Sequence, residues 1–96
     1  VHGGIIPNIP IEKQKKDVLL WDRDLIKYSQ TNYIKGYDKI FIGHTTTQMI
    51  NDDTKPVRYN NLICMDTGCG NDGKLTLMKI DTEEYFQSKK QKSLFH

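Results

Sequence analysis

Two histidines of this 96-residue chain stand where short strands are expected to end. His44 follows Gly43 and the apolar run Ile40–Ile42, which is β-branched and aromatic and too short for a helix. His2 precedes a pair of glycines, at a junction between a strand and a loop. Neutral imidazoles bind zinc, iron, manganese or nickel, but a catalytic zinc usually takes about three protein ligands. Two histidines alone therefore make an incomplete metal site, and an ordinary surface histidine near a terminus is the alternative for His2.

Two further residues could join these histidines in one cleft. Arg23 follows Trp21 and Asp22, and its guanidinium could bind an oxyanion through two parallel hydrogen bonds. The alternative for Arg23 is a weak surface ion pair with a neighbouring aspartate. Asp66 stands directly before a glycine-rich turn at 67–73.

The elements that position these residues can be predicted from periodicity. Apolar residues recur at spacings of three and four between residues 11 and 28, which predicts a helix with an apolar stripe at Val18, Trp21, Leu25 and Tyr28. Strands are predicted at 40–42, 56–59, 62–66 and 74–80, with a hairpin turn at 60–61 and an edge strand or short helix within 81–88. We expect residues 49–55 to form a loop.

This pattern predicts an α/β (α+β) fold, mostly strands with one or two helices. Because few residues remain to cover both faces of a sheet, the chain looks like half of a sandwich. We expect one domain at 1–88 and a solvated basic tail at 89–96.

Composition excludes several partners. Fourteen basic and twelve acidic residues leave a net charge of +2, which argues against nucleic acid. The absence of an 18-residue apolar run argues against a membrane span. Cys64 and Cys69 match neither a redox pair nor a zinc knuckle, so we expect two free thiols in a cytoplasmic protein. A disulfide across the turn is the alternative.

Five short motifs occur in an order that resembles a known family. They are VHGGI at 1–5, LWDR at 20–23, IGHT at 42–45, MDTG at 65–68 and GKLT at 73–76. In this order they resemble the C-terminal half of a metallophosphoesterase of the calcineurin-like superfamily, most closely the bacterial and phage type of serine/threonine protein phosphatase. The resemblance implies the C-terminal part of a four-layer αββα sandwich.

The resemblance also implies roles for individual residues. His2 and His44 match metal ligands, and Arg23 matches the arginine that grips phosphate. Asp66 matches a supporting residue, and Gly43 and Thr45 flank the histidine in the same strand-end motif. The family uses two divalent metal ions, for which manganese is our first expectation, with iron or zinc as alternatives. The implied substrate is a phosphorylated protein or a small phosphoester. Thr46 stands where the family often has proline, so the loop after His44 is less predictable.

The family's N-terminal motifs, Asp-x-His, Gly-Asp-x-x-Asp-Arg and Gly-Asn-His, do not occur in this chain. These motifs carry the remaining metal ligands and the general acid, so we assign no catalytic residue here. We expect a C-terminal fragment, inactive by itself, of an enzyme that hydrolyses phosphoesters. A non-catalytic binding or interaction half-domain with relict histidines is the alternative. An exposed sheet surface should also favour self-association.

Overall fold

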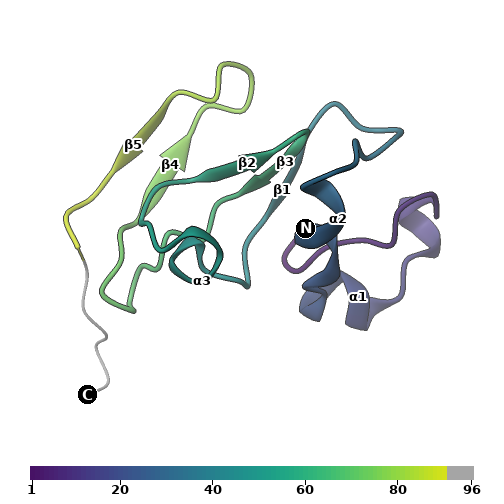
Figure 1. Ribbon diagram of the computed structural model, residues 1–96, viewed down its shortest axis with the longest axis horizontal. Coiled ribbons are helices and arrows are strands. Elements are labelled where there is room, and N and C mark those ends of the chain that lie inside the picture. The colour runs from purple at the N-terminus through teal and green to yellow at the C-terminus, as the bar shows by residue number, and fades with distance from the viewer. Residues whose placement is uncertain (91–96) are drawn as a thin grey trace.

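A three-stranded sheet forms the centre of the computed structural model, which describes residues 1–90 (Figure 1). Its strands are β1 (Ile40–Ile42), β2 (Val57–Tyr59) and β3 (Leu62–Cys64), in the spatial order β1-β3-β2. Strand β1 runs parallel to β3, whereas β2 and β3 form an antiparallel hairpin. Each strand is a short run with β-branched or aromatic residues, as the sequence predicts.

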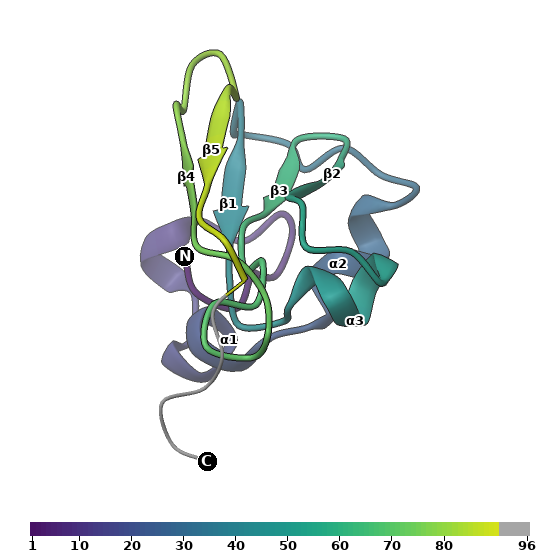
Figure 2. The ribbon, with the colours of Figure 1, turned by 90° about the vertical axis from the view of Figure 1, so that its left-hand side faces the viewer.

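The two faces of this sheet pack against different partners. Ile40, Ile42 and Leu62 point toward helix α2 (Asp24–Ser29), where Leu25 and Ile26 complete the main apolar core. Ile63 lies on the opposite face because side chains alternate along a strand. It is only 1% exposed. That face looks toward the hairpin of β4 (Thr76–Met78) and β5 (Tyr85–Gln87), which lies on the other side of the sheet from α2 (Figures 1 and 2).

Polar contacts hold this second hairpin against the sheet. The ammonium group of Lys39 donates hydrogen bonds to the carbonyl oxygens of Ile80 at 2.6 Å and Asp81 at 3.0 Å. Nε of Arg58 lies 2.8 Å from a carboxylate oxygen of Glu83. The strand expected at 74–80 is present as the shorter β4, and the edge strand expected within 81–88 is present as β5, antiparallel to β4.

The helical region is broken where one continuous helix was expected. It consists of a 3₁₀ turn (Ile11–Lys13), α1 (Lys16–Trp21) and α2. The carboxylate of Asp22 accepts a hydrogen bond from the backbone N–H of Leu25 at 3.0 Å, which satisfies a donor in the first turn of α2 and lets the chain change direction. The predicted apolar stripe is broken with it: Leu25 is buried, but Trp21 is 62% exposed.

The predicted turn between β2 and β3 also anchors the connector that follows α2. Tyr59 pairs with Leu62, so Asn60 and Asn61 form the turn, with Asn60 in the left-handed region at φ 54°. The buried Asn61 amide accepts a hydrogen bond from Ile34 N–H and donates to Ile34 O, both at 2.9 Å. The turn is thus tied to the core as well as closing the hairpin.

A third helix, α3 (Thr47–Asn51), occupies part of the segment expected to be a loop. The N–H of Thr47 donates to the carbonyl of Asp66 at 2.7 Å, and its hydroxyl donates to the carbonyl of Asp53 at 2.9 Å. These contacts come from residues distant along the chain or beyond the helix, so local propensity did not predict them. The structure is an α+β fold with short helices and two small sheets, which confirms the expected fold class.

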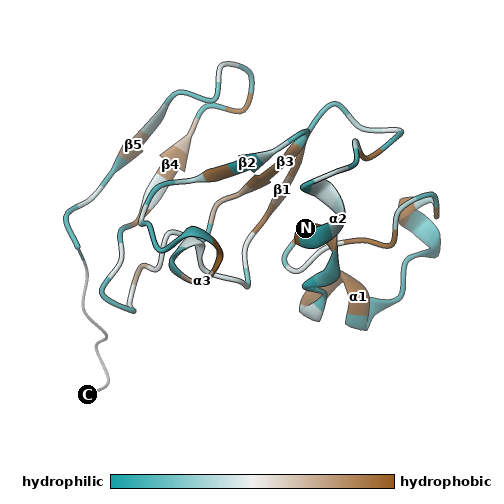
Figure 3. Ribbon diagram, in the orientation of Figure 1, coloured by the Kyte–Doolittle hydropathy of each residue, from teal (hydrophilic) through white to brown (hydrophobic). Residues whose placement is uncertain are grey.

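Apolar residues are concentrated in the central sheet, and some also lie on the outside of the β4–β5 hairpin (Figure 3). Leu77 and Phe86 face each other across the two strands and are 67% and 59% exposed. We call Leu75, Leu77 and Phe86 the hairpin face. Among residues 1–90, no helix is long and apolar enough to cross a membrane. Of the expected tail at 89–96, residues 91–96 lie outside the described residues.

Candidate functional site

The candidate site lies at the carboxyl ends of β1 and β3. Because these strands are parallel neighbours, the segments that follow them meet at one edge of the sheet. The N–H of Met65 donates to the carbonyl of Ile42 at 2.8 Å, which continues the pairing beyond both strands. A methyl group built onto Gly43 would lie 4.0 Å from Cβ of Asp66. Two of the sequence-predicted segments are therefore adjacent.

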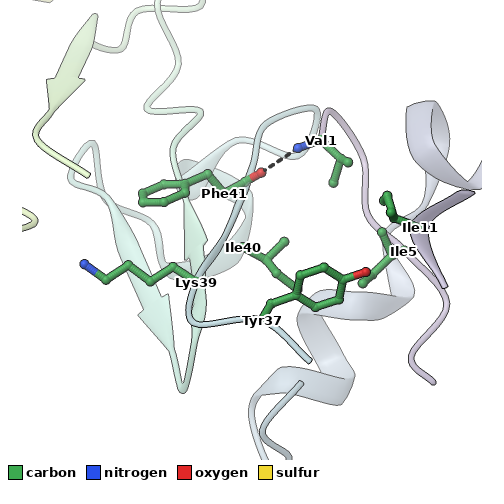
Figure 4. A pocket seen from close by; sticks show the side chains of 7 residues that line it. All are labelled: Val1, Ile5, Ile11, Tyr37, Lys39, Ile40 and Phe41. Atoms are coloured by element: carbon green, nitrogen blue, oxygen red, sulfur yellow. Dashed lines mark hydrogen bonds between the residues drawn. The ribbon is translucent and has the colours of Figure 1, made fainter. Parts of the chain in front are cut away.

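The N-terminal residues run along the open edge of β1 and bring His2 to the same place. The amino group of Val1 donates to the carbonyl of Phe41 at 3.0 Å (Figure 4). The N–H of Gly43 donates to the carbonyl of His2 at 2.8 Å, and Gly3 N–H donates to Leu19 O at 2.7 Å. His2 is thus held between β1 and the end of α1.

Gly3 is needed for this arrangement. A Cβ atom at this position would lie 2.8 Å from the backbone nitrogen of Asp22 and 2.8 Å from the backbone carbonyl of Leu20. Both neighbours are backbone atoms, which cannot move aside as a flexible side chain could. The close backbone approach that the paired glycines allow therefore occurs here, between the first residues and the end of α1.

The two histidine rings come together. The ring centres of His2 and His44 are 5.1 Å apart, with their planes tilted by 53°. His2 is exposed and His44 is half-buried. Trp21 approaches His44 edge-on, with ring centres 5.4 Å apart and planes at 77°. Periodicity predicts Trp21 in the core stripe, which is wrong, and it does not predict this contact. The position of Trp21 in the LWDR motif, two residues before Arg23, is the signal that could have indicated it.

The sharp turn at this site is at His44, although the glycine before it, Gly43, is the residue type that would turn most easily. The N–H of Thr45 donates to the carbonyl of Gly43 at 2.6 Å, so His44 is the central residue of a three-residue turn, with φ 63°. A left-handed φ is uncommon for a residue with a side chain, and such a turn is strained. Gly43 has no positive φ, and a Cβ there would come no closer than 3.8 Å to Nδ1 of His2. The strained backbone conformation therefore occurs at His44, the residue whose imidazole is a candidate metal ligand.

Arg23 lies beside the strand-end loop. Its side chain is exposed and makes no ion pair within residues 1–90, so the alternative of a surface pair with a neighbouring aspartate does not occur. Arg23 lines a hollow of about 430 Å³, which we call the basic hollow. Its lining includes Arg23, Ile26, Lys27, Thr45, Met49 and Ile50.

Thr45 connects this hollow to the histidines, because it follows His44 directly and lines the hollow. It is 8% exposed, and its hydroxyl oxygen is buried with no hydrogen-bond partner in the described part of the chain. An unsatisfied buried hydroxyl costs free energy, so a site that retains one is a candidate for ligand binding.

Asp66 supports the loops around the site through its own backbone and carboxylate. Its Oδ1 accepts a hydrogen bond from Gly68 N–H at 3.2 Å, and its carbonyl accepts the bond from Thr47 that begins α3. Within residues 1–90 its carboxylate makes no hydrogen bond to either imidazole. The structure therefore places Asp66 as support for the loops rather than for the histidine rings.

The described residues contain no group of three or more histidine, cysteine, aspartate or glutamate side chains placed to hold a metal ion. Neither cysteine adds a ligand to the histidine pair. Both are free thiols, so the alternative of a disulfide is wrong. Burial raises the pKa of the Cys64 thiol to about 11, so it stays protonated at neutral pH and is a poor ligand.

A separate hollow of about 260 Å³ lies between the N-terminal segment and β1 (Figure 4). Its lining is mainly apolar, from Val1, Ile5, Ile11, Ile40 and Phe41, with Tyr37 and Lys39. It contains neither a histidine nor a carboxylate, so we place the candidate functional site at the histidine pair and the basic hollow.

No protein-family model, curated protein or solved structure matches the chain. The functional assignment therefore depends on the residues themselves and on their geometry.

Proposed function

We propose that this chain forms one wall of the metal centre of a metallophosphoesterase similar to the bacterial and phage serine/threonine phosphatases. The observation that carries the proposal is the pairing of His2 and His44, whose ring centres are 5.1 Å apart at the shared end of two parallel strands. The complete enzyme hydrolyses a phosphorylated protein or a small phosphoester. This chain alone lacks the ligands needed for turnover.

The distance between the centres of the two imidazoles is compatible with a shared ion. A ring nitrogen lies about 2 Å from its metal, so two imidazoles on one ion have their centres about 5 Å apart. Manganese is our first expectation, and iron or zinc would accept the same donors. Two histidines leave the coordination incomplete. The remaining ligands of a two-metal centre belong to the Asp-x-His, Gly-Asp-x-x-Asp-Arg and Gly-Asn-His motifs, which are absent from these 96 residues.

The proposed roles of the metal ions, Arg23 and His44 follow from the chemistry of each. When bound, two divalent ions supply a hydroxide at neutral pH and neutralise phosphoryl oxygens during in-line attack. Arg23 holds the same oxygens with a charge that is always present, and no carboxylate in residues 1–90 competes for its guanidinium. The turn at His44 and the bond from Gly43 N–H to the carbonyl of His2 bring the two imidazole rings side by side.

A manganese titration of the intact 96-residue chain tests the proposal. We expect paramagnetic Mn²⁺ to broaden the ring resonances of His2 and His44 before those of the third histidine, His96. His44→Ala should weaken Mn²⁺ binding at least about tenfold because one of two ligands is lost. His96→Ala is the matched control and should leave the affinity unchanged. Equal Mn²⁺ affinity in the wild type and His44→Ala would refute the metal site.

The same titration separates the alternative function. The lack of a three-ligand group in the described residues favours a non-catalytic interaction half-domain with relict histidines. That alternative predicts no selective broadening at His2 and His44 and no change of thermal stability on adding Mn²⁺. It also predicts that Arg23→Ala leaves phosphate binding unchanged, whereas the phosphatase proposal predicts weaker binding.

We further propose that a second copy of the chain covers the hairpin face. Leu75, Leu77 and Phe86 are exposed together on a two-stranded sheet, and such surfaces favour association. The two free thiols support a cytoplasmic location, because reducing compartments keep cysteines unpaired.

A further inference from the structure

The basic hollow contains two cations on one wall. Arg23 directly precedes α2 and Lys27 lies in its last turn, and both side chains line the hollow. Neither makes an ion pair within residues 1–90, where the ion pairs involve Lys39, Arg58 and Lys79. The lining of the hollow therefore includes two cations that form no ion pair within residues 1–90.

The opposite wall is apolar and comes from α3. Met49 is 68% exposed, and Ile50 beside it is half-buried. Ile26 of α2 adds a buried apolar surface between the two walls. A methionine side chain is flexible and polarizable, so it can adapt to different aliphatic partners. No aromatic ring lines the described hollow.

The hollow is continuous with the proposed phosphate site. Thr45 lines it and follows the metal-ligand candidate His44, and the buried Thr45 hydroxyl has no partner among the described residues. Arg23 lines the hollow and is also the residue that we propose binds the phosphoryl group. A substrate whose phosphate lies at Arg23 can therefore place its neighbouring groups against Lys27 and Met49, which line the same hollow.

We propose that the basic hollow binds the peptide segment beside a phosphorylated residue. Lys27 pairs with a carboxylate of that segment, and Met49 with Ile50 contacts an aliphatic side chain. This inference rests on the proposed function and narrows its substrate to an acidic, apolar phosphopeptide. A nucleotide fits less well, because bases are usually bound by stacking on aromatic side chains, and none lines this hollow.

Nuclear magnetic resonance titrations of the intact chain test the inference without requiring catalysis. The probe is a short peptide with a phosphoserine flanked by glutamate and leucine. Matched peptides replace the glutamate with glutamine, the leucine with alanine, or the phosphoserine with serine. We expect the first peptide to shift the methyl resonances of Ile26, Met49 and Ile50, and each replacement to reduce the affinity.

Two variants and two controls test which side chains contribute to peptide binding. Lys27→Ala should weaken binding about two- to fivefold, as for one exposed ion pair. Met49→Ala should weaken it about three- to tenfold because apolar contact area is lost. Lys35→Ala is the control for charge, and Ile80→Ala, at 69% exposure, is the control for an exposed apolar side chain. Both controls should bind as the wild type does, and amide spectra of all four should show the native fold.

The outcomes separate this inference from the proposed function. Binding that depends on Arg23 but not on Lys27 or Met49 would overturn the inference and leave the phosphatase proposal intact. Loss of binding in both hollow variants, without selective Mn²⁺ broadening of His2 and His44, would support the hollow and overturn the metal site. Absence of methyl shifts at millimolar peptide, or tighter binding of adenosine triphosphate in the hollow, would overturn the inference.

Discussion

The sheet edge beside His2 and His44 differs from the β4–β5 hairpin in two respects: how crowded the backbone is, and which kind of side chain is exposed. At the sheet edge the backbone is crowded, with no room for a Cβ at Gly3, and His44 adopts a strained φ. The side chains there are polar and accessible. In the hairpin the pairing is regular, from Thr76 opposite Gln87 to Met78 opposite Tyr85, but large apolar side chains face outward.

This difference shows two ways in which a structure indicates function. Crowding and strain cost stability, so they persist where the position of a ring matters. A regular strand pair with an exposed apolar face has no internal strain, but it leaves surface that a second molecule can cover. We interpret the first pattern as a candidate site for small groups and the second as a candidate surface for association.

The largest expected effect is on the crowded backbone. Gly3→Ala should lower the free energy of unfolding by about 2–3 kcal/mol, because its methyl group would collide with the backbone of Leu20 and Asp22. Gly43→Ala is the matched control and should leave stability equal or raise it by up to about 1 kcal/mol, since its Cβ has room. Urea unfolding followed by circular dichroism measures both. Equal losses in the two variants would show that the crowding at Gly3 is not real.

A smaller effect is expected at the hairpin face. Replacing Leu77 and Phe86 together by serine should weaken self-association about tenfold, because it removes the exposed apolar pair. Size-exclusion chromatography with light scattering over a range of concentrations measures this. Met49→Ser is the control, since Met49 is equally exposed but lies on α3. A monomeric wild type at every concentration would contradict the association proposal.

The smallest effect isolates the strain at His44. His44→Gly should be more stable than His44→Ala by about 1 kcal/mol, because glycine adopts a left-handed φ without penalty. Both variants lose the same imidazole, so their Mn²⁺ affinities should fall equally. Chemical unfolding of the two variants side by side gives the difference. If alanine were the more stable of the two, His44 would not be held in the left-handed region.

Much of the strand arrangement was predictable from local pattern. The strand at 40–42 and the turn at 60–61 follow from β-branched residues and paired asparagines, and they are confirmed. The strand expected at 62–66 is confirmed over Leu62–Cys64 only. The helical segment was predicted less well. Its break depends on the contact between the Asp22 carboxylate and Leu25, and α3 depends on a bond from Thr47 to Asp66. Neither contact follows from periodicity, because periodicity reports only which side chains share a face.

The sequence by itself determined the chemical types of the site residues and the strand end that carries His44. Those features depend on local propensity, which neighbouring residues set. The strand expected before the loop at His2 is wrong, because residues 1–10 form no strand and are held on the edge of β1 by single backbone hydrogen bonds. Only the tertiary structure decided that His2 lies beside His44, that Trp21 contacts His44 instead of the core, and that a strained turn forms at His44. The physical reason is the parallel pairing of β1 with β3 and the docking of the N-terminal segment on β1. Both bring together residues that are far apart along the chain.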